Sequence, residues 1–205
     1  MPLNLPRQAF SKEDSSPDSR FYGSPRFVTH IDDHAIAAVT KAYREFLPAG
    51  GVILDLMSSW VSHLPPEVEY REVIGHGMNE EELQANPRLS RFFVQDLNAD
   101  PVLPLDTASV DGAAICVSIQ YLQQPVAVFA EVRRVLRPGG PVVIAFSNRC
   151  FPTKAVAIWL SLSGRDHARL VSSYLSEAGF KSIEAREPVP PGRFSDPLWI
   201  VVGRA

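Results

Sequence analysis

The sequence predicts an α/β fold: a single domain with a doubly wound, mostly parallel sheet of seven strands and an antiparallel hairpin at one edge. Two patterns indicate this fold. Apolar strands alternate with helical segments from Val52 to Ser147, which is typical of parallel strands joined by crossovers. Two further apolar runs then follow each other closely at the end of the chain, as in a hairpin. A length of 205 residues with 45% hydrophobic content suits one core.

The strands are short apolar runs, most of them bounded by turn residues. We expect them at residues 52–57, 69–75, 91–96, 110–119, 141–147, 181–187 and 198–203. The fourth run, VDGAAICVSI, is apolar almost throughout, as expected for a central parallel strand that is buried on both faces.

The helices are predicted from apolar periodicity and from their end signals. A helix over residues 33–47 has Asp33 as its expected N-cap, and a short helix follows Asn79, which forms a capping box with Glu82. The clearest helix covers residues 125–136 and has a proline in its first turn. A helical region over 153–178 should break near Ser163-Gly164.

The N-terminal residues differ in composition from the rest. Residues 1–20 are rich in proline, serine and charge, which predicts a disordered or loosely attached arm, so that the domain itself spans residues 21–205. Acidic residues within this arm argue against an organelle transit peptide, which is typically poor in acids.

Charge and composition narrow the class of partner. The net charge is −3 and the basic residues are scattered, which excludes a nucleic-acid surface as the main function. No apolar run is long enough for a membrane span, and Cys116 and Cys150 lie in or beside apolar strands. We therefore expect a cytoplasmic protein with no metal site; the oligomeric state cannot be read from the sequence.

Polar side chains follow the predicted strands where each strand ends. In open α/β sheets, ligands bind outside the carboxyl ends of the strands. These ends carry Asp55, Ser58, Ser59, Asn79, Asp96, Ser118, Tyr121, Asn148 and Arg149. Because parallel strands present their carboxyl ends at one edge, the sequence predicts a ligand pocket there.

These segments together resemble a known family. ILDL, a strand ending in VIGHGMN, FFVQDLN, VDGAAICVSIQYL and EVRRVLRPGGPVVIAFSN follow one another in the order seen in class I S-adenosylmethionine-dependent methyltransferases, over about residues 34–203. The piece EVRRVLRPGGPVVIAF is most similar to the quinone-biosynthesis C-methyltransferase group of small-molecule enzymes. The resemblance implies a Rossmann-like methyltransferase fold, S-adenosyl-L-methionine as cofactor, and in-line methyl transfer to a small molecule.

The resemblance also assigns the cofactor-binding residues. Asp55 corresponds to the acid that holds the methionyl end, and Asp96 to the acid that accepts the adenine amino group, with Leu97 stacking nearby. Ser118 begins the segment beneath the reactive methyl group.

The first motif departs from the family pattern. Met57, Ser59 and Val61 stand where glycines usually allow positive φ and close approach of the ligand. Ser58 and Ser59 are expected to supply hydroxyl donors to a ligand carboxylate instead. The acid that binds the ribose hydroxyls should fall near Gly77 and is absent; Asn79 or Glu80 would replace it in part.

The acceptor side rests on fewer signals. Tyr22, Tyr121, Asn148 and Arg149 are the expected substrate-binding residues, and a basic rim of Arg149 and Lys154 is typical of a site for an anionic molecule. His30 and His63 are weak candidates for a catalytic base, although histidines in such places are more often packing residues.

Two aromatic features have alternative interpretations. The segment with Phe21, Tyr22, Arg26 and Phe27 forms either a lid over the cofactor or a cover for a sheet edge. Trp60 either closes the pocket or packs in the core, and core packing is the expectation.

Two other functions compete with methyl transfer. The lost glycines and the missing ribose acid are also compatible with an inactive descendant that binds or regulates, whose pocket would be empty or filled by Met57 and Trp60. A nicotinamide-dependent oxidoreductase is disfavoured because the GxGxxG turn is absent.

Overall fold

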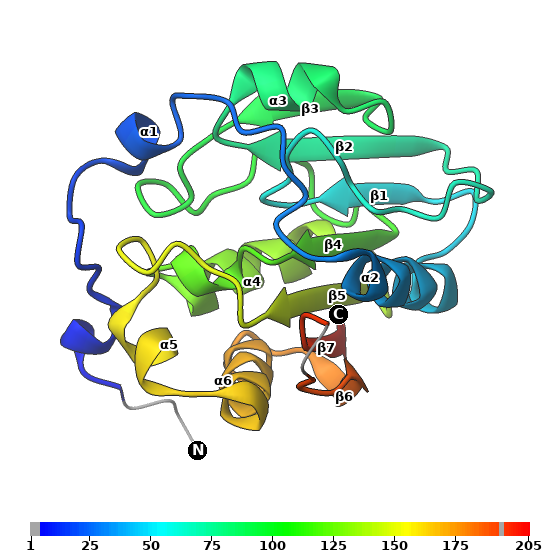
Figure 1. Cartoon of the computed structure of the whole chain (residues 1–205). Helices are drawn as coiled ribbons and strands as arrows, with labels where there is room; N and C mark the ends of the chain where they lie inside the picture. Colours follow the sequence, from blue (N-terminus) through cyan, green and yellow to red (C-terminus); the bar gives the residue numbers. More distant parts are fainter. Residues whose placement is uncertain (1–4, 193–194) are drawn as a thin grey trace.

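The computed structural model describes residues 5–192 and 195–205, and its centre is one seven-stranded sheet with the order β3-β2-β1-β4-β5-β7-β6 (Figure 1). β1 to β5 are parallel, and β7 runs antiparallel to both β5 and β6. The strands are β1 (Val52–Asp55), β2 (Glu72–Gly77), β3 (Arg91–Val94), β4 (Gly112–Cys116), β5 (Pro141–Ser147), β6 (Lys181–Val189) and β7 (Leu198–Arg204). The predicted doubly wound sheet with its edge hairpin is confirmed.

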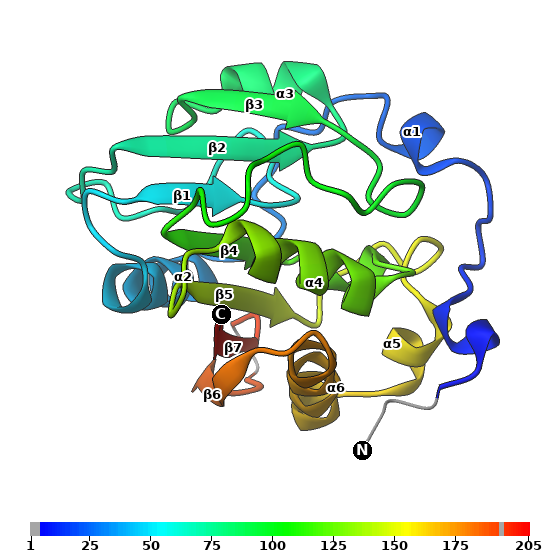
Figure 2. The ribbon, with the colours of Figure 1, turned by 180° about the vertical axis from the view of Figure 1, so that it is seen from behind.

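Helices cover both faces of the sheet (Figures 1 and 2). One apolar cluster lies between the sheet and α2, and another lies between the sheet and α4 and α6. The helical elements are η1 (Arg7–Phe10), α1 (Asp18–Phe21), α2 (Asp33–Phe46), α3 (Glu80–Ala85), η2 (Ile119–Tyr121), α4 (Pro125–Val135), α5 (Ala157–Ser161) and α6 (Gly164–Glu177). In the described part of the chain, none of these is both long and apolar enough to cross a membrane.

The helix ends follow the predicted signals with two corrections, of which one is that the Glu82 carboxylate accepts from Ser59 and Arg26 rather than completing the capping box with Asn79. Asn79 is the N-cap of α3 and accepts the backbone N–H of Glu82 at 3.0 Å. The long helical region does break at Ser163-Gly164, between α5 and α6. The N-cap of α2 is Asp32 rather than Asp33: its carboxylate accepts the N–H of Ala35 at 2.9 Å, the bond that an N-cap side chain makes.

The N-terminal residues are not a loose arm over their described part. Residues 5–32, here called the strap, run past the carboxyl ends of the strands before α2 begins (Figure 1). Lys12 forms an isolated antiparallel bridge with Val156, and the ammonium of Lys154, which is fully buried, forms ion pairs with Asp14 at 3.0 Å and Asp18 at 3.3 Å. The composition of residues 1–20 could not reveal this packing, because Lys154 and Val156, which contact the strap, are distant from it in sequence. Residues 1–4 lie outside the described residues.

The connection from β1 to β2 is unusual for parallel strands, which are normally joined by a helix. Residues 56–71 are all described, and they form turns and irregular structure without a helix. The loop therefore has no helix N-terminus to direct toward a ligand, and its first residues fold onto the end of β2.

Candidate active site

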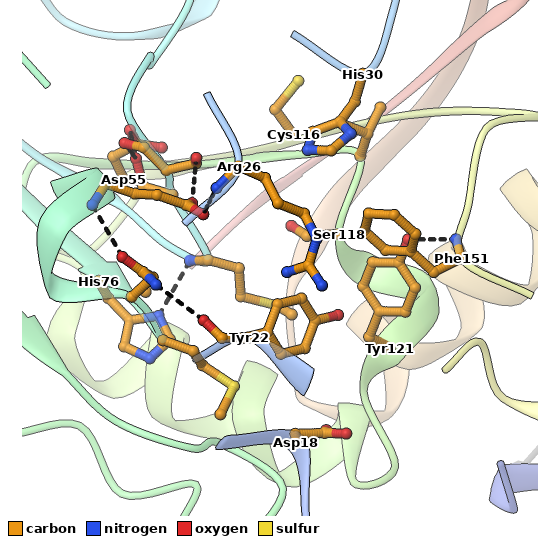
Figure 3. Close-up of a pocket in the computed structure, with 18 of the residues that line it drawn as sticks. Asp18, Tyr22, Arg26, His30, Asp55, His76, Cys116, Ser118, Tyr121 and Phe151 are labelled. Carbon is orange, nitrogen blue, oxygen red and sulfur yellow. Dashed lines mark hydrogen bonds between the residues drawn. The ribbon is translucent and has the colours of Figure 1, made fainter. Parts of the chain in front are cut away.

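A cavity of about 300 Å³ lies at the carboxyl ends of β1 to β4, beneath the strap (Figure 3). Most of the predicted site residues line it. These are Tyr22, His30, Asp55, Met57, Ser58, Ser59, His63, Asn79, Asp96, Leu97, Ser118, Tyr121 and Arg149. Asp18 and Glu82, which were not predicted to be in the site, also line it, together with Arg26 of the possible lid and His76 at the end of β2.

Asp55 ends β1 and is buried, with 3% of its surface exposed. Burial raises its pKa to about 6, and hydrogen bonds from Ser58 and Ser62 act in the opposite direction. The hydroxyl of Ser58 donates to the carboxylate at 2.6 Å. Ser58 was predicted to donate a hydrogen bond to a ligand carboxylate, but in the structure it donates to the carboxylate of Asp55.

The backbone after β1 is also bonded within the protein. The N–H of Met57 donates to Nδ1 of His76 at 3.0 Å, and the N–H of Ser58 donates to the carbonyl of His76 at 2.6 Å. Because Nδ1 accepts a hydrogen bond, the proton is on Nε2, which lies 3.0 Å from the carbonyl oxygen of Gln95. Burial lowers the pKa of His76 to about 4, so this imidazole is neutral near pH 7.

Met57 has a positive φ, a conformation that the glycine expected at its position would adopt readily. Its φ is 57°, in the left-handed region that costs a residue with a side chain about 1 kcal/mol or more. The bond to His76 holds it there. The turn after β1 therefore forms without a glycine at position 57.

The structure leaves no room for a side chain at Gly77, near which the resemblance places the ribose acid. A Cβ atom on Gly77 would lie 2.6 Å from the carbonyl oxygen of Ser58, closer than real Cβ contacts. The loop after β1 occupies the space that a carboxylate side chain would need. The folded-back loop therefore requires glycine at position 77.

The carboxylate in the cavity nearest in sequence to this position belongs to Glu82. It accepts the hydroxyl of Ser59 at 2.5 Å and the backbone N–H of Arg26 at 2.7 Å. The predicted substitutes differ from it: the amide nitrogen of Asn79 donates to the carbonyl of Tyr22 at 3.0 Å, and the exposed Glu80 does not line the cavity. Sequence reasoning assigned Glu82 only to the capping box.

The ends of β3 and β4 have polar atoms that remain available. Asp96 is half-buried and accepts the N–H of Asn98 at 2.9 Å through one carboxylate oxygen, beside the buried Leu97. Ser118 has 8% of its surface exposed, and its hydroxyl has no hydrogen-bond partner among the described residues. This hydroxyl is therefore available to bond with a water or a ligand.

The strap closes the cavity from above. Tyr22 lines it, and its hydroxyl is buried without a partner among the described residues. Burial raises the pKa of Tyr22 far above its ordinary value, so the phenol stays protonated. The guanidinium of Arg26 lies over the rings of Phe21 and Phe151, at 4.5 Å and 5.4 Å from their centroids. Of the two interpretations of this segment, the position fits a lid.

The two candidate bases both line the cavity. His30 and His63 have positive φ values of 61° and 51°, and burial lowers the pKa of each. His30 packs edge-on against Phe151 at a centroid distance of 5.5 Å. Both imidazoles are therefore neutral near pH 7, the form that accepts a proton.

The predicted basic rim is wrong for Lys154, and Arg149 lines the cavity but already has a carboxylate partner. Lys154 is buried and bound to the aspartates of the strap. Arg149 lines the cavity, but its side chain is 63% exposed and donates to Asp196 at 2.8 Å. Asn148 is exposed, accepts the hydroxyl of Ser147 at 3.1 Å, and does not line the cavity.

Trp60 has neither of its predicted positions. It is half-buried outside the apolar clusters and does not line the cavity. Its Nε1–H donates to the carbonyl of Val28 at 3.0 Å, and its ring packs edge-on against Phe27. Trp60 therefore attaches the strap to the loop after β1.

Comparison with known proteins agrees with this arrangement. A family model described as a methyltransferase domain matches residues 60–144. None of the curated proteins compared with the sequence matches it.

Solved structures share the fold. A SAM-dependent methyltransferase from Aquifex aeolicus is 17% identical with a TM-score of 0.59, and the match covers 91% of this chain and 96% of that chain. A putative methyltransferase in complex with the Haloferax volcanii Trm112 methyltransferase activator is 17% identical, with a TM-score of 0.61 and coverage of 86% and 89%. The Haemonchus contortus phosphoethanolamine N-methyltransferase 2, in complex with S-adenosyl-L-methionine, is 14% identical, with a TM-score of 0.59 and coverage of 82% and 51%.

The match to a methyltransferase-domain model therefore covers residues 60–144, and the solved structures show that the chain has the fold of S-adenosylmethionine-dependent methyltransferases. The quinone-biosynthesis group is one branch of that class, and only the sequence resemblance indicates it.

Proposed function

We propose that the cavity binds S-adenosylmethionine and that the protein transfers its methyl group to a small molecule. One observation supports this most: Asp96, Leu97 and Ser118 lie together at the ends of β3 and β4 with unused hydrogen-bonding capacity. In open α/β sheets this edge is where ligands bind.

The residues fit the cofactor unevenly. Asp96 would accept the adenine amino group beside Leu97, and Glu82 would receive the ribose hydroxyls in place of an acid at position 77. Glu82 has the capacity, because its two carboxylate oxygens offer about four acceptor positions and accept one hydrogen bond from Arg26 and one from Ser59. Asp55 would face the methionyl end. The fit is good at the adenine end. It is poorer at the methionyl end, where Ser58 and Ser59 already donate to Asp55 and Glu82.

The bound cofactor would supply an electrophilic methyl group on a sulfonium. The residues of the chain align the reactants and exclude water, which is the main requirement for an in-line displacement. Neutral His30 or His63 would accept a proton from an acceptor O–H or N–H, which a base does best in its neutral form. The resemblance of EVRRVLRPGGPVVIAF to quinone-biosynthesis enzymes favours a C-methyltransferase, for which an activated carbon would be the nucleophile.

Calorimetric titration with the demethylated product, S-adenosylhomocysteine, tests the proposal. The wild type should bind, and Asp96→Asn should bind about tenfold more weakly, because one acceptor oxygen is lost while the bond to Asn98 can persist. Asp100→Asn is the matched control, because Asp100 accepts Val102 N–H from the same loop and does not line the cavity.

Absence of heat and of a thermal shift in the wild type would contradict the proposal. Binding without methylation of any acceptor would favour the inactive, binding alternative.

A further inference from the structure

Arg26 is the cation in the cavity that lacks a carboxylate partner. The predicted anion-binding residues are engaged: Arg149 with Asp196, and Lys154 with Asp14 and Asp18. Among the described residues, no carboxylate forms an ion pair with the guanidinium of Arg26; Glu82 binds its backbone N–H instead. The cation available to an anionic ligand is therefore Arg26 of the strap, rather than Arg149 or Lys154 of the predicted rim.

The guanidinium has unused donors. Of the five N–H groups of an arginine, one binds the carbonyl of Phe21 at 2.8 Å and another makes a long contact of 3.4 Å with the carbonyl of Ser24. Figure 3 shows the group projecting from the strap into the space between Tyr22, Ser118 and Tyr121. Arg26 also lines the cavity, so its remaining donors are accessible to a ligand.

Aromatic rings surround this group and form flat walls. Phe21, Phe151 and Tyr22 have their centroids 4.5, 5.4 and 5.9 Å from the guanidinium carbon. Tyr121 stacks on Phe151 with an interplanar angle of 27°. Rings on the faces of a guanidinium leave its edge free for a planar carboxylate, and parallel rings favour a flat guest.

The other acids of the cavity have partners other than the guanidinium of Arg26, and Asp96 accepts the backbone N–H of Asn98. Asp18 is paired with Lys12 and Lys154 within the strap and its anchor. Asp55 accepts from Ser58, and Glu82 accepts from Ser59. Close to Arg26, the unused polar atoms are the hydroxyls of Tyr22 and Ser118, which are buried and unpartnered among the described residues.

On the basis of the proposed function, we propose that Arg26, Tyr22, Tyr121 and Phe151 form the acceptor subsite, and that it selects planar aromatic acids. Arg26 binds the carboxylate through its edge, the rings hold the aromatic plane, and the hydroxyl of Tyr22 bonds to a second polar group of the acceptor.

Calorimetry with matched probes tests this subsite in the full chain saturated with S-adenosylhomocysteine. The probes are 4-hydroxybenzoate and 4-hydroxycinnamate, their neutral amides, and cyclohexanecarboxylate. The wild type should prefer at least one aromatic acid over its amide by about tenfold or more, because a charge-assisted pair is lost in the amide. It should also prefer that acid over the cyclohexane acid.

Three variants separate charge, shape and folding. Arg26→Gln should abolish the preference for acid over amide, and Arg26→Lys should retain part of it, since a lysine keeps the charge without the fork of donors. Arg169→Gln, which removes an 80% exposed arginine on α6, should leave the preference unchanged. The thermal midpoint of each variant without ligand shows whether the strap still folds.

Equal binding of acid and amide, or no binding of either acid, would overturn the proposal while leaving cofactor binding intact. A second result would also overturn it. If Arg26→Gln weakens S-adenosylhomocysteine but not 5′-methylthioadenosine, which lacks the amino-acid part, then Arg26 binds the carboxylate of the cofactor and not that of an acceptor.

Discussion

The two halves of the cavity differ in how their polar groups are used. At the ends of β1 and β2, Met57 and Ser58 donate to His76, and Ser59 donates to Glu82. At the ends of β3 and β4, Asp96 keeps a free carboxylate oxygen and Ser118 has no partner among the described residues. The first half is largely hydrogen-bonded within the protein, and the second half keeps unused hydrogen-bonding groups. A tight turn after a strand can therefore form without glycine, provided that neighbouring residues accept its backbone donors.

Substitution of Gly77, which lies against the loop after β1, should have the largest effect on the free energy of unfolding. Gly77→Asp should lower the free energy of unfolding by about 4 kcal/mol, because its Cβ meets the Ser58 carbonyl and its charge is buried. Urea denaturation measures this loss. Gly77→Ala should show about half of it, because it adds the Cβ without the charge. An aspartate that is tolerated and strengthens cofactor binding would mean that the loop readily moves away.

His76 should make stability depend on pH. Its folded pKa, about 4, lies below the ordinary 6.5, so the unfolded state binds more protons between these values. Its contribution of about 3 kcal/mol is present above pH 6.5 and is lost as the pH falls through 4. The unfolding free energy of the wild type minus that of His76→Gln should fall accordingly. A difference that stays constant from pH 7 to pH 4 would show that His76 is not buried as a neutral acceptor.

Asp55 should act with the opposite sign. Its pKa is raised from 3.8 to about 6, so the folded state binds more protons in this window. Relative to Asp55→Asn, the wild type should be favoured at pH 4 and should lose about 3 kcal/mol as the pH rises through 6. Because His76 and Asp55 oppose each other, the wild type alone should show a shallow profile. Parallel profiles of wild type and Asp55→Asn would contradict a buried carboxyl here.

Trp60 gives the smallest expected effect. Trp60→Phe removes the 3.0 Å bond to the carbonyl of Val28 and should lower the unfolding free energy by about 1 kcal/mol. It keeps an aromatic ring against Phe27, whereas Trp60→Leu does not. Amide exchange in residues 26–30 should rise in both variants, and more in the leucine variant. Unchanged exchange would mean that other contacts attach the strap.

The elements of the sheet could be predicted because their signals are local. Apolar runs, the capping residue Asn79 and the break at Ser163-Gly164 each depend on a few neighbouring residues. The cavity could be predicted as well, since parallel strands bring their ends together.

The partners of individual side chains could not be predicted, because they depend on distant residues. Lys154 was predicted to be a cation at the rim of the cavity, but it is buried and paired with Asp14 and Asp18 of the strap. Arg26 and Glu82 join across 56 positions of sequence. The space at Gly77 is set by a carbonyl of another loop, which no pattern of residue types shows.

Hydrogen–deuterium exchange with and without S-adenosylhomocysteine tests the difference between the two halves most directly. The amides of residues 56–58 should already be protected without ligand and should not change, because Leu56, Met57 and Ser58 donate to protein acceptors. New protection should appear in residues 95–99 and 117–122. A large change at residues 56–58, or no change in either of the other segments, would contradict the account.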